Sequence, residues 1–299
     1  MKAMILAAGF GTRLRPLTER VPKPLMPVAN RPVLLRNLEY LRSHGVGQVV
    51  VNAHHHADQL VDFVRSNPLP GMRVEVRVEP QILGTGGGVA NTADFWSEES
   101  FFVMNGDILT DIDLTKGLEH HRRGGHPATL ILHDRPPYNK IKLDPGGCVA
   151  EIPSEYDGNG WAFTGIHILE PEILSYLPKG VFSDIVDCYR RLIHSGRAIG
   201  AYLSTGHQWR DIGTVSEYLQ ANREFSPAPF AVDWGCEIDL SVTWKDWAVV
   251  GAGSRVERDA EISRSVLWPG VIVRAGVKVR DSVLTSGRVL ESDLVSSVV

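Results

Sequence analysis

From position 250 to the end of the chain, a bulky apolar residue recurs at every sixth position. One series runs from Val250 to Trp268, and a second series, shifted by three residues, runs from Val271 to Val295. Glycines stand between many of these positions. A six-residue period with turn residues between the apolar positions is typical of a parallel β-helix built from hexapeptides. We therefore predict that residues 226–299 form a left-handed parallel β-helix, which begins at the Ser-Pro-Ala-Pro linker of residues 226–229.

The first 225 residues alternate short apolar segments with segments of helical periodicity. Strands are predicted at residues 4–7, 48–52, 74–78, 101–104, 128–132, 140–143 and 162–169, and helices at 33–44, 57–64, 182–194 and 215–224. This alternation predicts an α/β domain over residues 1–225, with a Rossmann-like, mainly parallel sheet and helices on both faces. Ligands of such sheets bind beyond the carboxyl ends of the strands. Residues 8–15 and 105–107, which directly follow two predicted strands, are therefore the first places to examine.

The composition narrows the class of protein and its partners. The chain has 299 residues, of which 43% are hydrophobic and 22% charged, with a formal net charge of -4. This balance is that of an ordinary globular chain and gives no global positive field for nucleic acid or an anionic membrane, so we expect neither partner. Three cysteines without CxxC spacing and an apolar N-terminal run that ends at Gly9 suggest no disulfide framework, transmembrane span or signal peptide. A cytoplasmic protein is the expectation.

A glycine-rich segment follows the first predicted strand. Residues 6–13 read LAAGFGTR, and Lys23 stands between two prolines downstream. The glycines let the backbone approach a phosphate, Arg13 offers a forked donor, and the stiff backbone around Lys23 can aim its ammonium group. The segment is neither a Walker A loop nor a dinucleotide fingerprint, because no Gly-Lys-Ser/Thr follows and Leu14 replaces the third glycine. A GxG alone would indicate only a tight turn, but together with Arg13 and Lys23 it indicates polyphosphate binding.

A second glycine-rich segment, LGTGGG, covers residues 83–88. Adjacent glycines leave room for a flat ring and expose main-chain groups as a base-reading edge, although such a run is also found in flexible loops that precede helices. Glu79 lies five residues before Gly84. A carboxylate suits the N–H groups of guanine or the single imide N–H of uracil, and it suits adenine poorly.

Two aspartates follow apolar segments, Asp107 in MNGD and Asp211 in WRDIG. An isolated aspartate more often belongs to a turn or a helix cap than to a metal site. The neighbouring Asp111 and Asp113 are interpreted as a loop residue and a helix-start residue.

These segments resemble the signature of the sugar-1-phosphate nucleotidyltransferases, or nucleotide-sugar pyrophosphorylases, and particularly of the mannose-1-phosphate guanylyltransferases. The resemblance covers about residues 1–225, and a hexapeptide β-helix is common among relatives. It implies that Asp107 and Asp211 bind Mg²⁺, that Arg13 holds the leaving pyrophosphate, and that Lys23 steadies the phosphates. It also implies that Glu79 reads the base, for which we favour guanine because it offers two adjacent donors. The nucleotide-binding residues expected on this basis are Leu6, Ala7, Gly9, Gly11, Thr12, Arg13, Lys23, Glu79, Gly84, Gly86 and Asp107.

For the sugar, the resemblance points to the segment Phe163–His167 and to Asn105. Thr164 and the main chain of Gly165 are expected to bond sugar hydroxyls, although an ordinary core strand would have the same pattern. Many relatives carry Glu-Lys-Pro upstream, whereas this chain has Glu-Ile-Pro at 151–153. The sugar phosphate must then be held by another cation, for which Lys140 and Arg210 are the candidates.

The reaction expected is transfer of a nucleoside monophosphate from a nucleoside triphosphate to a sugar 1-phosphate, with release of pyrophosphate. We favour GTP with mannose or heptose 1-phosphate; UTP with an amino sugar 1-phosphate is the main alternative. Hexapeptide acyltransferases, which the repeats also resemble, usually need a catalytic histidine. The last histidine of this chain, His207, precedes the repeats, so this class is disfavoured. The presence of Arg13, Lys23, Asp107 and Asp211 disfavours a non-catalytic nucleotide-sugar sensor. The β-helix is interpreted as a packing element and as a surface for homo-oligomer formation.

Overall fold

The computed structural model describes residues 1–136, 138–155 and 158–299. These residues form two compact units, one comprising residues 1–10 and 36–211 and the other residues 11–35 and 212–299. The predicted boundary after residue 225 therefore differs from this division, because the second unit also takes in the segments 11–35 and 212–225. No helix among the described residues is both long and apolar enough to cross a membrane.

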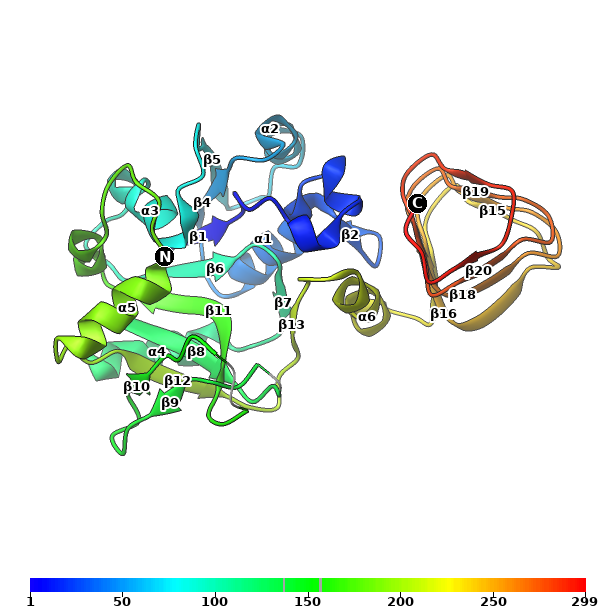
Figure 1. Cartoon of the computed structure of the whole chain (residues 1–299). Helices are drawn as coiled ribbons and strands as arrows, with labels where there is room; N and C mark the ends of the chain where they lie inside the picture. Colours follow the sequence, from blue (N-terminus) through cyan, green and yellow to red (C-terminus); the bar gives the residue numbers. More distant parts are fainter. Residues whose placement is uncertain (137, 156–157) are drawn as a thin grey trace. The chain divides into compact units, whose positions relative to one another are not determined.

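The first unit is built on a seven-stranded sheet with the order β12-β8-β11-β6-β1-β4-β5 (Figure 1). Neighbouring strands run parallel except at β11, which pairs antiparallel with both β6 and β8. The strands are β1 (Lys2–Leu6), β4 (Gln48–Ala53), β5 (Arg73–Val78), β6 (Phe101–Asn105), β8 (Ala128–His133), β11 (Ala162–Leu169) and β12 (Gly200–Ser204). The predicted α/β class and mainly parallel sheet are confirmed.

Helices cover both faces of this sheet. Leu130 of β8 belongs to the same buried cluster as Tyr189 of α5 (Ile185–His194) and Val89 of α3 (Gly84–Ala90). The next residue of β8, Ile131, points the other way, because alternate strand residues face opposite sides. There, a Cβ atom on Gly117 of α4 (Leu114–Gly124) would lie 3.4 Å from the Ile131 side chain. α3 and α5 therefore pack on one face and α4 on the other.

Most predicted elements are present, and the differences have local causes. The helices predicted at 33–44 and 57–64 are α1 (Val33–Ser43) and α2 (Ala57–Ser66). The helix predicted from 182 begins only at Ile185, because the Asp184 side chain accepts a hydrogen bond from Val186 N and caps it. The strand predicted at 140–143 is reduced to β9 (Lys142–Leu143), which forms a separate hairpin with β10 (Val149–Glu151). Asp113 caps α4 through Thr115 N and Lys116 N, as its interpretation as a helix-start residue requires.

In the second unit, the segment from Gly11 forms three short 3-10 helices and a small hairpin. These are η1 (Thr12–Leu14), η2 (Leu17–Glu19), η3 (Lys23–Leu25), β2 (Pro27–Val28) and β3 (Arg31–Pro32). The helix α6 (Val215–Phe225) begins at Thr214, whose hydroxyl accepts a hydrogen bond from Glu217 N. Within this unit the Tyr218 hydroxyl donates to Pro27 O at 2.5 Å and accepts from Trp268 Nε1 at 2.8 Å. This buried tyrosine thereby links the hairpin, α6 and the repeat segment.

The repeat segment forms parallel coils. Phe230 pairs with Ala248, Thr243 with Glu261, and Glu261 with Lys278, so that successive strands lie 17 or 18 residues apart. Three hexapeptides therefore make about one turn, and the apolar positions point inward. The predicted parallel β-helix is confirmed. Its strands are β14 (Phe230–Val232), β15 (Glu237–Ile238), β16 (Thr243–Val250), β17 (Arg255–Val256), β18 (Glu261–Leu267), β19 (Ile272–Val273), β20 (Lys278–Arg280), β21 (Val283–Leu284), β22 (Val289–Leu290) and β23 (Leu294–Val295).

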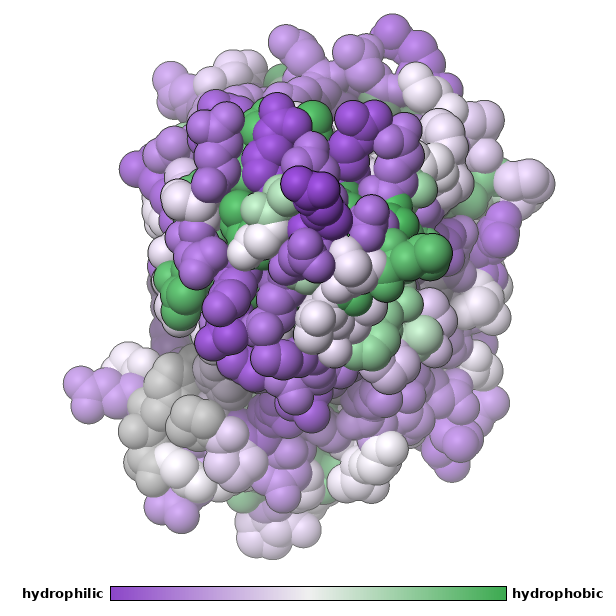
Figure 2. Space-filling view, turned by 90° about the vertical axis from the view of Figure 1, so that its right-hand side faces the viewer, coloured by the Kyte–Doolittle hydropathy of each residue, from purple (hydrophilic) through white to green (hydrophobic). Residues whose placement is uncertain are grey.

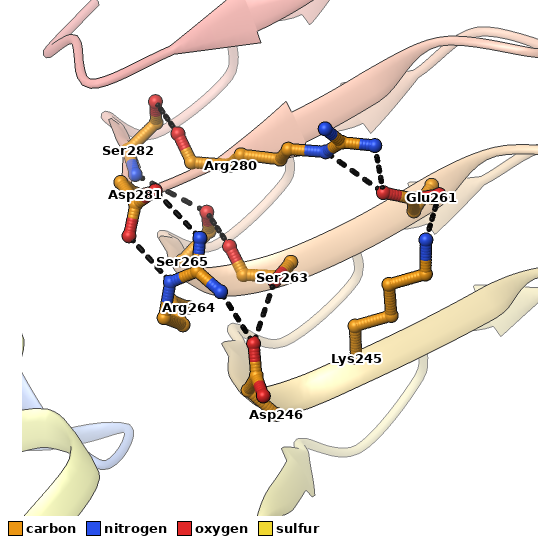
Figure 3. Close-up of polar contacts among 9 residues, drawn as sticks. All are labelled: Lys245, Asp246, Glu261, Ser263, Arg264, Ser265, Arg280, Asp281 and Ser282. Carbon is orange, nitrogen blue, oxygen red and sulfur yellow. Dashed lines mark hydrogen bonds and ion pairs between the residues drawn. The ribbon is translucent and has the colours of Figure 1, made fainter.

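Charged side chains from successive coils form ladders on the β-helix (Figure 3). Glu261 accepts from Lys245 Nζ at 2.7 Å and from Arg280 Nε at 2.8 Å. Arg264 donates to both carboxylate oxygens of Asp281 and also pairs with Asp246. In the view of Figure 2, hydrophilic residues predominate and hydrophobic residues occur among them in small groups. The ladders thus connect side chains of successive coils by charged hydrogen bonds.

Replacing Glu261 by glutamine is expected to destabilise the protein by about 1 kcal/mol at pH 7. The Glu261 side chain is only 12% exposed and faces two cations, which would both lose their charged partner. Hydrogen bonds from Lys245 and Arg280 lower the pKa of Glu261. This stabilisation is present above the usual glutamate pKa of about 4.3 and is lost as the pH falls through the lower value in the folded state. Urea unfolding at pH 7 and pH 3 measures the difference between wild type and variant.

The matched control is Glu237→Gln, since Glu237 is 68% exposed and pairs with Arg255, which is 51% exposed. Its change in unfolding free energy should remain below about 0.5 kcal/mol. An equal loss in both variants, or a difference for Glu261→Gln that persists unchanged at pH 3, would contradict the buried role of Glu261.

Candidate active site

Three adjacent strands of the first unit end at or near candidate site residues. Leu6 ends β1, Asn105 ends β6, and Asn52 lies one residue before the end of β4. In the sheet β1 lies between β4 and β6. After β1 the chain adds β4 and β5 on one side, and it then crosses to the other side of β1 to add β6, so the strand order reverses at β1. Ligands of open α/β sheets bind outside such a reversal. The first candidate region predicted from the sequence therefore lies where the topology places a ligand site.

A cavity of about 300 Å³ opens at this edge of the sheet. Backbone and side-chain atoms from four strand ends and loops surround it. Its lining residues are Leu6, Ala8, Gly9, Asn52, Ile82, Gly84, Thr85, Asn105 and Asp107. Four of the residues expected to bind the nucleotide, namely Leu6, Gly9, Gly84 and Asp107, thus line one cavity, which we call the nucleotide pocket after that expectation.

The glycines at 86–88 do not form a loop that leaves room for a base. They lie inside α3 and are buried. A Cβ atom at Gly86 would lie 2.8 Å from Ser183 Oγ, and one at Gly87 would lie 2.5 Å from Val181 O. The small residues are required because α3 packs closely against the segment before α5. Gly86, expected at the nucleotide, contacts this segment instead, and only Gly84, with φ +71°, reaches the pocket.

Glu79 is also placed behind the pocket. Its side chain is 1% exposed, and its two oxygens accept hydrogen bonds from Asn52 Nδ2 at 2.7 Å and Leu83 N at 3.0 Å. Ala7 is buried too and donates its N–H to Asn52 Oδ1 at 2.8 Å. The expected contact between the Glu79 carboxylate and a base therefore has no support in this position. Asn52, which the sequence reasoning missed, lines the pocket in its place.

The two aspartates expected to hold a metal ion lie close together. β7 (Ile108–Thr110) pairs antiparallel with β13 (Trp209–Asp211), and Asp211 stands opposite Ile108, the residue after Asp107. Given a cross-strand Cα spacing of about 5 Å and a step of 3.8 Å along the chain, their Cα atoms lie within about 10 Å. Gly106 N also donates to Leu6 O at 2.8 Å, which ties the turn before Asp107 to the end of β1.

A second cavity, of about 180 Å³, adjoins the first through Asn105. We call it the sugar pocket. Its walls combine apolar and aromatic side chains with polar ones. They comprise Asn105, Ile108, Tyr138, Lys140, Ile141, Ile152, Phe163, Thr164, Gly165, Val186, Trp209 and Asp211. All four residues expected at the sugar line this pocket. Asp107 lines one pocket and Asp211 the other, so the acidic pair lies where the two pockets meet.

The residues of β11 shape this junction. Gly165 has φ +75°, and a Cβ atom there would lie 2.7 Å from Asn105 Nδ2. The glycine therefore leaves the space in which the Asn105 amide lies. Thr164 lines the pocket, but its hydroxyl already donates to Ile131 O at 2.7 Å. Its carbonyl accepts from Trp209 Nε1 at 2.8 Å, which fixes the indole in the pocket wall.

Of the two cations considered for the sugar phosphate, Lys140 lines the sugar pocket and Arg210 does not. Arg210 is 6% exposed and lies between Trp209 and Asp211 on β13, so that its side chain points to the opposite side of the strand. Burial, together with the neighbouring charge of Arg190, lowers the pKa of Lys140. A phosphate beside Lys140 would favour its charged form.

The remaining expected residues, Gly11, Thr12, Arg13 and Lys23, belong to the second unit. Gly11 adopts φ +62°, and its carbonyl accepts from the Thr18 hydroxyl at 2.9 Å. The Arg13 guanidinium passes over Gly213, where a Cβ atom would lie 3.1 Å from Arg13 Nη2. Lys23 begins η3, with Leu25 N bonded to Pro22 O. These turns hold both cationic residues in defined local conformations.

Comparison with known proteins agrees with this geometry. The pattern of the family described as "Nucleotidyl transferase" matches residues 2–226. The chain belongs to the nucleotidyl transferase family. Among its relatives in the family, a UTP--glucose-1-phosphate uridylyltransferase of Synechocystis sp. is 31% identical, over 95% of this chain and 82% of that protein.

Two further proteins are similar to this chain over large regions. Mannose-1-phosphate guanylyltransferase 1 of Arabidopsis thaliana is 30% identical, over 99% of this chain and 85% of that protein. The crystal structure of HddC from Yersinia pseudotuberculosis complexed with GMP-PN superposes with a TM-score of 0.67, at 26% identity, over 75% of this chain and 99% of that one. The relatives thus differ in the base that their names specify.

Proposed function

We propose that this nucleotidyl transferase couples a nucleoside triphosphate to a sugar 1-phosphate, forming a nucleotide-sugar and pyrophosphate. The observation that carries the proposal is the junction of two pockets at Asn105, with Asp107 on one side and Asp211 on the other. A donor phosphate and an acceptor phosphate must meet at such a junction for one to attack the other. Nucleotide-sugars supply polysaccharide synthesis, including that of the cell envelope, and we place the enzyme in the cytoplasm with its nucleotide donors.

The proposed step is an in-line displacement. A phosphate oxygen of the acceptor forms a bond to the α-phosphorus of the donor, and the bond from that phosphorus to the pyrophosphate oxygen breaks. No protein nucleophile or base is needed, because the acceptor phosphate is already deprotonated at neutral pH. The protein's contribution is to position the two phosphates and to offset their charge.

The acidic pair fits a magnesium ion by its donor set. No group of three or more histidine, cysteine, aspartate or glutamate side chains suited to a metal occurs among the described residues. Mg²⁺ is usually bound by one or two carboxylates and completes its shell with substrate phosphate oxygens and water. Asp107 and Asp211 would hold it, and the ion would supply charge neutralisation at the reacting phosphates. The family motif assigns Arg13 and Lys23 to the triphosphate and its leaving pyrophosphate.

For the base and sugar we propose GTP with mannose or heptose 1-phosphate. Support comes from the Arabidopsis guanylyltransferase, which matches nearly the whole chain, and from the HddC structure complexed with GMP-PN. The second candidate is uridylyl transfer to an amino sugar 1-phosphate. Similarity to the Synechocystis uridylyltransferase supports UTP as the donor. An N-acyl group on the sugar would suit the apolar walls formed by Ile152, Phe163 and Val186.

Pyrophosphate release tests the function directly. Each of the four nucleoside triphosphates is combined with mannose, glucose, heptose and N-acetyl amino sugar 1-phosphates. One combination should release pyrophosphate at a rate at least tenfold above the others, and GTP with a mannose-type acceptor is expected to be that one. Release with UTP and an amino sugar would select the second candidate, and no release with any pair would refute both.

Lys140→Met is expected to raise the KM for the sugar 1-phosphate by about 30-fold, with a smaller effect on the KM for the nucleotide. The substitution removes the one cation that lines the sugar pocket among the described residues, and a charge-assisted hydrogen bond contributes about 2 kcal/mol. Steady-state kinetics with each substrate varied in turn separates the two constants. Lys142→Met, two residues away and half exposed on β9, is the matched control and should change neither.

We also propose that the β-helix mediates homo-oligomer formation. Its first coil leaves Trp234 80% exposed and Val232 45% exposed. A large exposed aromatic side chain beside other apolar groups commonly marks an interface. Light scattering of the wild-type chain and of Trp234→Glu measures the molar mass in solution. The variant should have a lower molar mass than the wild type, because a buried charge at the interface would dissociate the oligomer.

A further inference from the structure

Four polar groups form a continuous chain between the two loops of the nucleotide pocket. Ala7 N donates to Asn52 Oδ1 at 2.8 Å, Asn52 Nδ2 donates to Glu79 Oε1 at 2.7 Å, and Leu83 N donates to Glu79 Oε2 at 3.0 Å. Ala7 begins the loop whose next residues, Ala8 and Gly9, line the pocket. Leu83 precedes Gly84 and Thr85, which line it from the other side. The side chains of Asn52 and Glu79 therefore connect both walls.

This chain of hydrogen bonds is inside the protein. Asn52 is 2% exposed and Glu79 is 1% exposed, and both carboxylate oxygens have protein donors. A buried carboxylate is costly unless it is hydrogen-bonded, and these contacts satisfy it. The carboxylate thus serves the two loops, and its oxygens are not directed to a ligand.

The glycine at position 88 makes room for this pair. An added Cβ atom there would lie 2.8 Å from Asn52 Nδ2 and 3.2 Å from Glu79 Oε1. The last glycine of the LGTGGG segment thus contacts the pair and does not reach the pocket. Three separate segments therefore meet at the hydrogen bond between Asn52 and Glu79: β4, the residue after β5, and α3.

We propose that Asn52 and Glu79 are a positioning pair that sets the separation of the two nucleotide loops, and that Glu79 acts through Asn52 and Leu83 and not on the base. The inference deepens the proposed function and rests on it as far as kinetics are concerned. It predicts that damage to the pair weakens the binding of all nucleoside triphosphates alike. A base-reading carboxylate would instead change the preference between bases.

The pair allows a test by reversal of its central hydrogen bond. Glu79→Gln alone turns an acceptor into an N–H donor that must face either Leu83 N or Asn52 Nδ2, which leaves a buried donor unsatisfied. Asn52→Asp alone brings two carboxylates together. In the double variant Asn52→Asp/Glu79→Gln, the introduced amide donates to the introduced carboxylate, while Ala7 N and Leu83 N keep their acceptors. All four groups are then satisfied in the same positions.

The experiment measures KM and kcat for GTP and UTP in the wild type, both single variants and the double variant. Each single variant should raise the KM for both nucleotides by about tenfold or more, with the GTP to UTP preference unchanged within threefold. The double variant should return to within about threefold of the wild type. A tenfold change in base preference with Glu79→Gln, or a double variant no better than the worse single variant or unable to fold, would overturn the proposal.

A matched control and a second readout keep this test separate from the proposed function. Glu75→Gln makes the same chemical change on β5, the strand that ends just before Glu79, at a carboxylate that pairs with Arg77 at 2.5 Å, and should leave the KM for both nucleotides unchanged. Amide hydrogen exchange at Leu83 and Ala7 in the ligand-free protein should be faster in both single variants and restored in the double variant. Unchanged exchange at both amides in the single variants would refute the pair even if the enzyme is active. If no triphosphate is turned over at all, the proposed function fails, while the exchange result still decides on the pair.

Discussion

Asp107→Asn should reduce kcat by about 10³-fold or more while the protein remains folded. The substitution keeps the size of the side chain and removes one of the two carboxylates at the junction of the pockets. If Asp107 holds a divalent ion at the reacting phosphates, its loss removes several kcal/mol of charge stabilisation from the transition state. Pyrophosphate release under saturating substrates measures kcat, and thermal unfolding reports the integrity of the fold.

Asp113→Asn is the matched control for this change. Asp113 lies six residues further on and caps α4 through Thr115 N and Lys116 N. Asparagine is an equally good N-cap, so the free energy of unfolding should be nearly unchanged. The kcat should stay within about threefold of the wild-type value. A rate for Asp107→Asn as close to wild type as that of the control would remove the proposed role of Asp107.

Gly165→Ala is expected to lower kcat/KM for both substrates by about 10²-fold. A Cβ atom at this position would lie 2.7 Å from Asn105 Nδ2 and 3.0 Å from Asn105 Cγ. The Asn105 amide must then move, and Asn105 lines both pockets. A displacement of about 1 Å in a positioning group can cost two orders of magnitude in rate. Kinetics with each substrate varied in turn gives the two values.

Part of any effect will come from backbone strain, because Gly165 has φ +75°. Gly147→Ala controls for this, since Gly147 has φ +81° and no neighbouring atom within 4 Å of an added Cβ. Both variants should lose about 1 kcal/mol of stability from the left-handed conformation, but only Gly165→Ala should lose activity. Equal activity in the two variants would show that Asn105 need not stay where it is.

The elements that the sequence predicted well are those whose pattern is local. Alternating apolar segments located β1, β4 and β6, and the segments after β1 and β6, which were singled out as ligand sites, both contribute to the nucleotide pocket. The six-residue period likewise predicted the β-helix, because each hexapeptide carries its own inward-facing residue. In each case the signal lies within a few residues of the feature it predicts.

Features that depend on contacts with distant segments could not be predicted from a local pattern. The glycines of α3 were interpreted as space for a base, whereas Gly84, Gly86 and Gly87 fit against the segment 181–185, almost a hundred positions away, and Gly88 fits against Asn52 and Glu79. Glu79 was assigned to the base because its carboxylate suits guanine, but its partners are Asn52 and Leu83. Nothing in the local pattern distinguishes a carboxylate that faces a ligand from one that faces a buried amide. Asn52 itself had one signal, since it is a polar residue near the end of a buried strand.

The proximity of Asp107 and Asp211 was the exception. Their approach depends on β13 lying beside β7, which no local pattern predicts. It was nevertheless anticipated, because the resemblance to a family supplied the long-range information. The register of Asp211 opposite Ile108 now gives this expectation a structural basis that is independent of the resemblance.

The most direct test of the account is to count the divalent ions held by this acidic pair. Electron paramagnetic resonance of Mn²⁺ titrated into the full chain, in the presence of a non-hydrolysable GTP analogue, measures bound ions and their affinity. The account predicts one tightly bound ion per chain, with an affinity that falls at least tenfold in both Asp107→Asn and Asp211→Asn but not in Asp113→Asn. Binding of Mn²⁺ with wild-type affinity in either of the first two variants would contradict it.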